Sequence, residues 1–172
     1  MKLGILSDTH ITNNFKKEKI TSLINQLNHA FKDVDEIVHA GDVSEEFFLE
    51  EIKGIARTIC VKGNLDNIEN LEIFKKFSIG RYNIGVIHIL PDNVEEFTKK
   101  HSLQILIFGH THQPLIKGTD FNVLLLNPGS PTEPKAPIER PGFMKPIARP
   151  SVITLNIDDD DILSTFIINL KF

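Results

Sequence analysis

Three short, mostly apolar segments near the start of the chain each lead into side chains that can bind a metal ion or a phosphate. Residues 2–6 are followed by Ser7-Asp8-Thr9-His10, residues 36–39 by Ala40-Gly41-Asp42, and residues 58–61 by a loop that contains Asn64 and Asp66. Segments of this length predict buried strands. Because α/β sheets keep ligands at the carboxyl ends of their strands, the pattern predicts an α/β fold with its functional site there.

Two helices are predicted between these strands. Apolar residues recur at helical spacing over residues 20–31. A second helix is predicted to begin with a capping box at Ser44, with Phe47, Phe48 and Ile52 on its apolar face. Strand, polar loop and helix thus alternate through the first third of the chain.

The second half is richer in predicted strands. They cover residues 74–79, 83–89, 104–108, 115–117, 121–126, 151–157 and 163–170, with a helix over residues 93–100. Two sheets flanked by helices are the simplest assembly of these elements. We therefore expect a single domain over residues 1–172, with a proline-rich loop at 131–150.

Composition narrows the classes of partner. A net charge of −4 provides no broad basic field, which argues against nucleic acid or an anionic membrane as the main partner. No apolar run reaches the ~18 residues of a membrane helix, and the first residues lack a signal-peptide pattern. Together with a single cysteine, Cys60, these features predict a cytoplasmic protein. Oligomeric state is left open, with a homodimer as one outcome.

Seven side chains at the strand ends and in the loops after them share metal-binding chemistry. They are Asp8, His10, Asp42, Asn64, His88, His110 and His112. Imidazole and oxygen donors without a thiolate favour borderline divalent ions such as Mn, Fe, Co, Ni or Zn. Seven donors exceed the needs of one tetrahedral ion, so two ions that share a bridging carboxylate are predicted.

The order of these blocks resembles the calcineurin-like metallophosphoesterase superfamily. The blocks are Asp8-Thr9-His10, Gly41-Asp42, Gly63-Asn64-Leu65-Asp66, His88 and Gly109-His110-Thr111-His112. The short chain and Asn127-Pro128-Gly129-Ser130 are similar to the small prokaryotic phosphodiesterases related to the retromer subunit Vps29.

The resemblance implies a four-layer αββα sandwich of two mixed sheets and a dinuclear centre, most simply with Mn. It implies Asp8, His10 and His112 on one ion and Asn64, His88 and His110 on the other, with Asp42 as the bridge. Two such ions would lower the pKa of a shared water to about 7, which supplies hydroxide at neutral pH. Asp42 and Asn64 thereby also count as catalytic, and Asp66 is expected to orient a histidine or to position the substrate.

The sequence departs from the family pattern at three places. Leu65 stands where the phosphatase branch carries a histidine that assists the leaving group, and leucine cannot donate a proton. Ile89 follows His88 in place of the usual glycine, which changes the backbone next to a ligand of the second ion. The proline-rich loop carries Arg140 and Arg149, which either overhang the site and bind a distal phosphate or belong to a plain surface loop.

These observations favour a hydrolase that acts on phosphate esters, most simply phosphodiesters on nucleotide-like small molecules, with a metal-activated water as nucleophile. Two alternatives remain. One is a binding scaffold in the manner of Vps29, and the other is a sensor that binds a phosphorylated ligand without turning it over.

Three further features are assigned structural roles. His39 alternates into its strand and is expected to be a buried, hydrogen-bonded residue. Cys60 is expected to pack as a small hydrophobic residue. The aspartates at 158–161 lack the glycine and spaced glutamate of a calcium loop and are expected to form a solvated turn.

Overall fold

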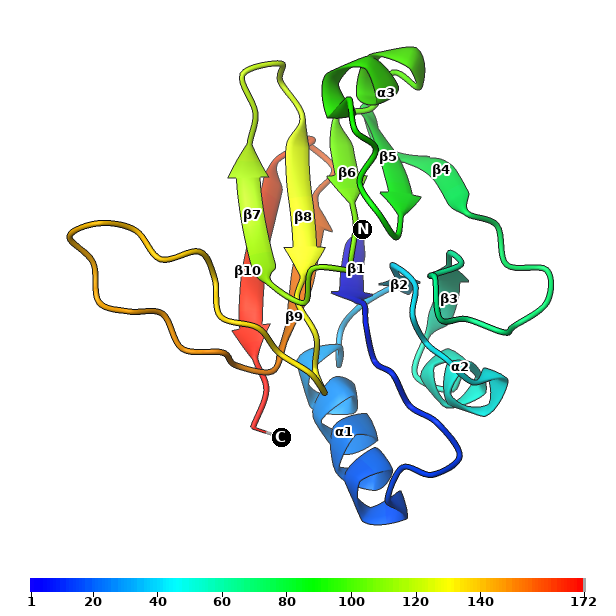
Figure 1. The fold of residues 1–172 in the computed structure, drawn as a ribbon. Coiled ribbons are helices and arrows are strands. Elements are labelled where there is room, and N and C mark those ends of the chain that lie inside the picture. Colours follow the sequence, from blue (N-terminus) through cyan, green and yellow to red (C-terminus); the bar gives the residue numbers. More distant parts are fainter. Residues whose placement is uncertain (172) are drawn as a thin grey trace.

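The computed structural model describes residues 1–171 and contains two five-stranded sheets (Figure 1). The first sheet has the order β10-β9-β1-β2-β3. Its strands are β1 (Lys2–Leu6), β2 (Glu36–His39), β3 (Arg57–Cys60), β9 (Ser151–Ile157) and β10 (Leu163–Asn169). The three strands from the first half of the chain run parallel, and β9 and β10 add an antiparallel pair, so the sheet is mixed.

The second sheet has the order β4-β5-β6-β8-β7 and is also mixed. Its strands are β4 (Phe74–Ile79), β5 (Tyr82–Ile87), β6 (Ile105–Ile107), β7 (Pro114–Gly118) and β8 (Leu124–Pro128). The three inner strands, β5, β6 and β8, are parallel, so their carboxyl ends share one edge of the sheet.

One apolar cluster contains side chains from both sheets, such as Ile5 of β1 and Ile107 of β6, both fully buried. A second cluster joins the first sheet to α1 (Lys17–Ala30) and α2 (Glu46–Lys53), and a third joins the second sheet to α3 (Val94–Lys100). Helix, sheet, sheet and helix are thus stacked as four layers (Figure 1). This confirms the predicted α/β fold class and αββα sandwich.

Close packing of α1 on the first sheet depends on a glycine in β1. A Cβ at Gly4 would lie 2.7 Å from the ring of Phe31, which follows α1 and is almost completely buried. The absent side chain therefore makes room for the aromatic ring at the centre of the second cluster.

Two local predictions were wrong. β8 begins at Leu124, because the Thr119 hydroxyl hydrogen-bonds both backbone groups of Val123 and closes a turn where the strand was expected to start. Ser44 does not cap α2, which begins at Glu46 without a side-chain cap. Ser44 instead has a φ of 78°, and its N–H donates to Asp66 Oδ1 at 2.7 Å.

Two structural roles are confirmed. Cys60 is 5% exposed, and burial raises the pKa of its thiol to about 12, so it remains a neutral core residue. The aspartate run joins β9 to β10 as an exposed turn, in which the Asp158 carboxylate accepts hydrogen bonds from Asp160 N and Ile162 N.

The proline-rich loop contains no helix or strand, and most of it projects past β7 and β10 (Figure 1). Arg140 and Arg149 are both exposed, and no hydrogen bond or ion pair joins either side chain to the strand-end loops in the described structure. The structure therefore favours the surface-loop alternative for this part of the loop. None of the described helices is long and apolar enough to span a bilayer.

Candidate metal centre

All seven predicted ligands lie together at the carboxyl ends of the strands. Asp8 and His10 follow β1, Asp42 follows β2, and Asn64 follows β3. From the second sheet, His88 follows β5, and His110 and His112 follow β6. Because both sheets direct these strand ends to one side of the sandwich, residues up to 104 positions apart in sequence share one site.

One group of ligand atoms consists of Asp8, His10 and His112, which offer atoms within 4.8 Å of one another. His112 Nε2 lies 3.5 Å from Asp8 Oδ1 and 3.1 Å from His10 Nε2. His10 Nε2 lies 3.9 Å from Asp8 Oδ1. This is the set that the family resemblance implies for the first ion.

A second group consists of Asp8, Asp42 and His88. His88 Nε2 lies 3.3 Å from Asp42 Oδ2 and 3.0 Å from Asn64 Oδ1, and the same amide oxygen lies 3.2 Å from His110 Nδ1. Asp42 Oδ2 also lies 3.9 Å from His10 Nε2. Both carboxylates therefore reach both groups, and the geometry is compatible with Asp42 as the bridge.

The backbone is strained at five of these seven residues. Asp8, His10, Asp42, His110 and His112 have φ angles of 53°, 47°, 56°, 67° and 60°. They make up half of the ten non-glycine residues with positive φ in residues 1–171. Because this region is unfavourable for side chains with a Cβ, its concentration here is typical of a functional site held in shape by its surroundings.

Backbone carbonyls fix the orientation of two histidines. His88 Nδ1 lies 2.8 Å from Ala40 O, and His112 Nδ1 lies 2.8 Å from Glu133 O. A carbonyl oxygen only accepts, so each Nδ1 carries the proton and each Nε2 points its lone pair into the site. This arrangement is common for histidines that bind metals, because it fixes both the tautomer and the ring.

The two carboxylates are held differently. Burial raises the pKa of Asp8, although a 2.6 Å hydrogen bond from Ser7 Oγ and the charges of nearby histidines oppose the shift. Burial also acts to raise the pKa of Asp42, but the His88 ring in its protonated form and a hydrogen bond from Leu65 N outweigh it and leave this pKa lowered. No lysine or arginine pairs with either carboxylate in the described residues, so a bound cation would compensate their charge.

Asp66 binds backbone N–H groups of two loops and not a histidine. Its Oδ2 accepts hydrogen bonds from Asp42 N at 3.0 Å and Gly63 N at 2.7 Å, and its Oδ1 accepts one from Ser44 N. No hydrogen bond joins it to a histidine in residues 1–171. The carboxylate is 4% exposed and ties the loop after β2 to the loop after β3. It therefore positions Asp42 through the backbone.

Replacing Asp66 with asparagine tests this role. Asparagine has an NH2 group in place of one carboxylate oxygen, and this group cannot accept the N–H hydrogen bonds made there. We therefore expect the free energy of unfolding to fall by about 2 kcal/mol. Metal affinity should fall roughly tenfold to a hundredfold, as for other residues that orient ligands. Urea unfolding and metal titration would measure the two effects, and unchanged metal affinity would contradict the positioning role.

Sequence reasoning missed the contacts that join the start of the proline-rich loop to the ligands. Ser130 Oγ donates to Asp8 O at 2.7 Å, and Thr132 Oγ1 donates to Thr9 O at 2.8 Å. The Asn127–Ser130 block marked this region, but hydroxyl bonds to a distant backbone leave no periodic pattern in a sequence. The loop thus contributes to the site through its first residues.

His39 is fully buried behind the site, as predicted, and its Nε2 lies 3.1 Å from Thr9 Oγ1. Its Nδ1 has no hydrogen-bond partner in the described structure. Burial is the main cause that lowers the pKa of His39 from 6.5 to about 3, with a further contribution from the charge of His88. The ring is therefore neutral over the whole physiological range.

This neutral histidine should make the metal-free protein less stable in acid. Between pH 6.5 and about 3 the unfolded chain binds a proton at His39 that the folded chain does not, so stability is complete above pH 6.5 and falls as the pH drops. The slope has a limit of about 1.4 kcal/mol per pH unit. His39→Gln should flatten the profile of unfolding free energy against pH, and parallel profiles for the two proteins would refute this cause.

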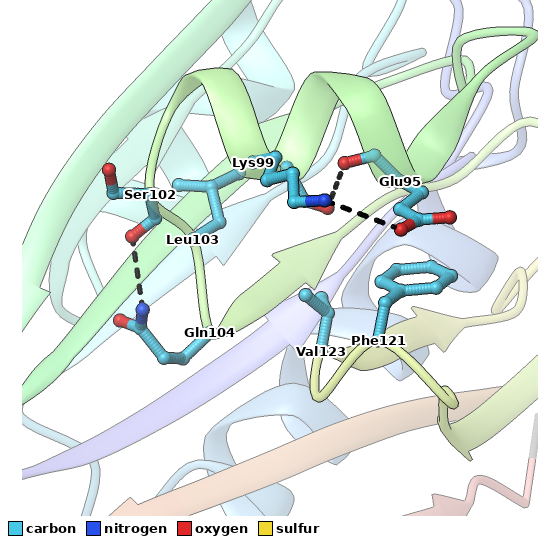
Figure 2. Close-up of a pocket in the computed structure, with 8 residues that line it drawn as sticks. Glu95, Lys99, Ser102, Leu103, Gln104, Phe121 and Val123 are labelled. Atoms are coloured by element: carbon cyan, nitrogen blue, oxygen red, sulfur yellow. Dashed lines mark hydrogen bonds and ion pairs between the residues drawn. The ribbon is translucent and has the colours of Figure 1, made fainter.

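A separate hollow of about 210 Å³ lies between α3 and the turn before β8 (Figure 2). Lys99 and Glu95 flank it and pair with each other at 3.7 Å, and Gln104 directly precedes β6. The ligand cluster follows the other end of β6. This hollow is therefore remote from the metal-binding chemistry.

Residues 1–157 match the calcineurin-like phosphoesterase superfamily domain. The chain belongs to this superfamily. Among its relatives is a "Probable metallophosphoesterase" of Methanothermobacter thermautotrophicus, which is 33% identical over 168 residues, with 93% of this chain and 88% of that protein covered. Membership of a calcineurin-like family agrees with the resemblance deduced from the five sequence blocks.

Solved structures share the calcineurin-like fold across nearly the whole chain. Zinc-bound Vps29 of Entamoeba histolytica has a TM-score of 0.69 and 22% identity, with 98% of this chain and 99% of that chain covered. A structure described as a novel archaeal phosphodiesterase has a TM-score of 0.66 and 24% identity, with 98% and 100% covered. At these identities the likeness concerns the fold.

Proposed function

We propose that the chain is a metal-dependent phosphodiesterase with a dinuclear centre. The ligands proposed for one ion are Asp8, His10 and His112, those for the other are Asn64, His88 and His110, and Asp42 is proposed as the bridge. When bound, two ions of this kind activate a water molecule as nucleophile and neutralise the oxygens of a phosphate.

The observation that carries the proposal is the convergence of histidine nitrogens and carboxylate oxygens, with no lysine or arginine side chain paired to them in residues 1–171. The Nε2 lone pairs of His88 and His112 face carboxylate oxygens at 3.3 Å and 3.5 Å. Lone pairs and carboxylates at these distances repel one another unless a proton or a metal ion lies between them. The donor set therefore fits one or more divalent cations.

The protein's own residues orient the histidine ligands and set the net charge of the site. Hydrogen bonds to Ala40 O and Glu133 O hold His88 and His112 in the ligand tautomer. Asn64 adds a neutral oxygen, which keeps the loaded site more positive toward an anionic substrate than a third carboxylate would. The lowered pKa of Asp42 keeps this carboxylate ionised at neutral pH.

Phosphodiesters are proposed over monoesters because of Leu65. This side chain is 56% exposed and offers no proton to a leaving group, although its backbone N–H bonds Asp42 at 2.8 Å. The similar fold of an archaeal phosphodiesterase supports the same choice. A substrate with a leaving group that needs no protonation suits such a site best.

The test is hydrolysis of bis-p-nitrophenyl phosphate and p-nitrophenyl phosphate by metal-stripped protein resupplied with Mn, Ni, Co, Zn or Mg. We expect metal-dependent release of p-nitrophenol, faster from the diester and greatest with Mn. If folded protein that binds metal released no p-nitrophenol with any of these metals, the proposed enzymatic activity would be refuted.

The structural neighbour Vps29 supports a second candidate, a protein-binding scaffold on the same fold. Retention of all seven metal-ligand types favours the enzyme over this scaffold. A sensor would instead bind a nucleotide tightly in the presence of metal and release no product, which calorimetry beside product analysis would reveal. A cytoplasmic location and a homodimer stay predictions.

A further inference from the structure

A second hollow, of about 400 Å³, opens directly beside the candidate metal centre. Asn64 and His88, both proposed ligands, form part of its wall. Ile73, Ile87 and Ile89 form most of the rest. The hollow is therefore continuous with the place where a phosphate would bind.

The apolar wall is unusually open to solvent for its residue type. Ile73 is 70% exposed and Ile89 is 47% exposed, although isoleucine is among the most frequently buried residues. Ile73 is held at this position by the chain itself, because Lys62 N donates a 2.8 Å hydrogen bond to Glu72 O and draws the segment before β4 toward the loop after β3. Ile89 follows directly on the ligand His88.

Charge at the hollow favours an anionic ligand with an apolar part. Lys62 also lines it and is exposed, and its ammonium group forms no ion pair within residues 1–171. No acidic side chain lines the hollow. A phosphate ester that places its phosphoryl group on the metal ligands would extend its substituent along the isoleucines.

We infer that Ile73, Ile87 and Ile89 form a subsite for an aromatic substituent of the phosphate ester, so that the site selects aryl or nucleobase-bearing esters over small alkyl esters. The inference rests on the proposed function. A hollow of about 400 Å³ lies within the size range of small-molecule sites and is large enough for a planar ring. Ile89, which stands where the family usually has a glycine, thus contributes to selectivity for the ester substituent.

The test compares the binding of phenylphosphonate and methylphosphonate to the manganese-loaded protein by calorimetry. These probes carry the same phosphoryl oxygens, are not hydrolysed, and differ only in the substituent. We expect phenylphosphonate to bind roughly tenfold more tightly, which corresponds to partial burial of one ring. In the double variant Ile73→Ser/Ile89→Ser, the preference for phenylphosphonate over methylphosphonate should shrink to about twofold.

Ile138→Ser is the matched control, because Ile138 is 78% exposed on the proline-rich loop and does not line the hollow. It should keep the wild-type preference. Equal affinities of the two phosphonates for wild-type protein, or a full preference in the double variant, would overturn the subsite alone. If neither phosphonate binds the metal-loaded protein, the proposed phosphate site fails and the subsite fails with it.

Discussion

Replacing Asp42 with alanine is expected to reduce metal-dependent diester hydrolysis by more than about a hundredfold. Removing a residue that only orients a metal ligand already lowers metal affinity or activity by roughly tenfold to a hundredfold, and Asp42 is a proposed ligand itself. Asp42 Oδ2 lies within 3.9 Å of histidines from both ligand groups, so its loss affects both proposed ions. Calorimetric titration with Mn should show weaker binding in the same variant. Initial rates with bis-p-nitrophenyl phosphate at saturating metal provide the second measurement.

Two controls separate this effect from misfolding. Asp42→Asn keeps the shape of the side chain and removes its charge, so it should retain the fold and lose most of the activity. Asp120→Ala removes an exposed carboxylate from the turn before β8 and should leave both metal binding and rates unchanged. An Asp42→Ala protein that binds metal and hydrolyses diester like the wild type would exclude Asp42 as a ligand.

Gly109→Ala, in the loop after β6 of the second sheet, is expected to lower both stability and metal affinity. A Cβ at this position would overlap Ser7 Oγ and lie 2.8 Å from Asp8 Oδ2 and 3.0 Å from Ala40 O. The added carbon must displace the hydroxyl that holds the Asp8 carboxylate, and overpacking of this kind costs about 1–3 kcal/mol of stability. We also expect metal affinity to fall by roughly tenfold or more, because Asp8 belongs to both ligand groups.

Gly118→Ala is the matched control for this substitution. A Cβ at Gly118 would meet no atom within 4 Å, so its stability and metal affinity should stay close to those of the wild type. Thermal unfolding and Mn titration of the two variants provide the comparison. Equal behaviour of both variants would show that the contact between Gly109 and Ser7 does not constrain the site.

Much of the site could be predicted because its residues occur at places that a sequence marks clearly. Asp8, Asp42 and Asn64 each follow a short strand, and parallel strands bring their carboxyl ends to one edge. The same rule predicted His110, which follows β6. Residue type and strand position were therefore sufficient to name all seven residues that the structure brings together.

Two of the errors arose where a side chain bonds to a distant part of the backbone. Ser44 matched a local capping pattern, yet Asp66, 22 residues later, takes its N–H. Asp66 was expected to orient a histidine or to position the substrate, and the histidine contact is missing in residues 1–171 because three backbone N–H groups satisfy its carboxylate. Such contacts are decided by which loops meet, and no periodicity records them.

The sequence by itself determined the α/β class, the family blocks and the metal-binding residue types, because strand periodicity and ligand chemistry are local properties. Only the tertiary structure decided that Asp8 belongs to both ligand groups, that carbonyls of Ala40 and Glu133 fix two histidine tautomers, and that isoleucines flank the centre. These features depend on distances between segments of two packed sheets. Packing fixes such distances, and a linear pattern of residues does not contain them.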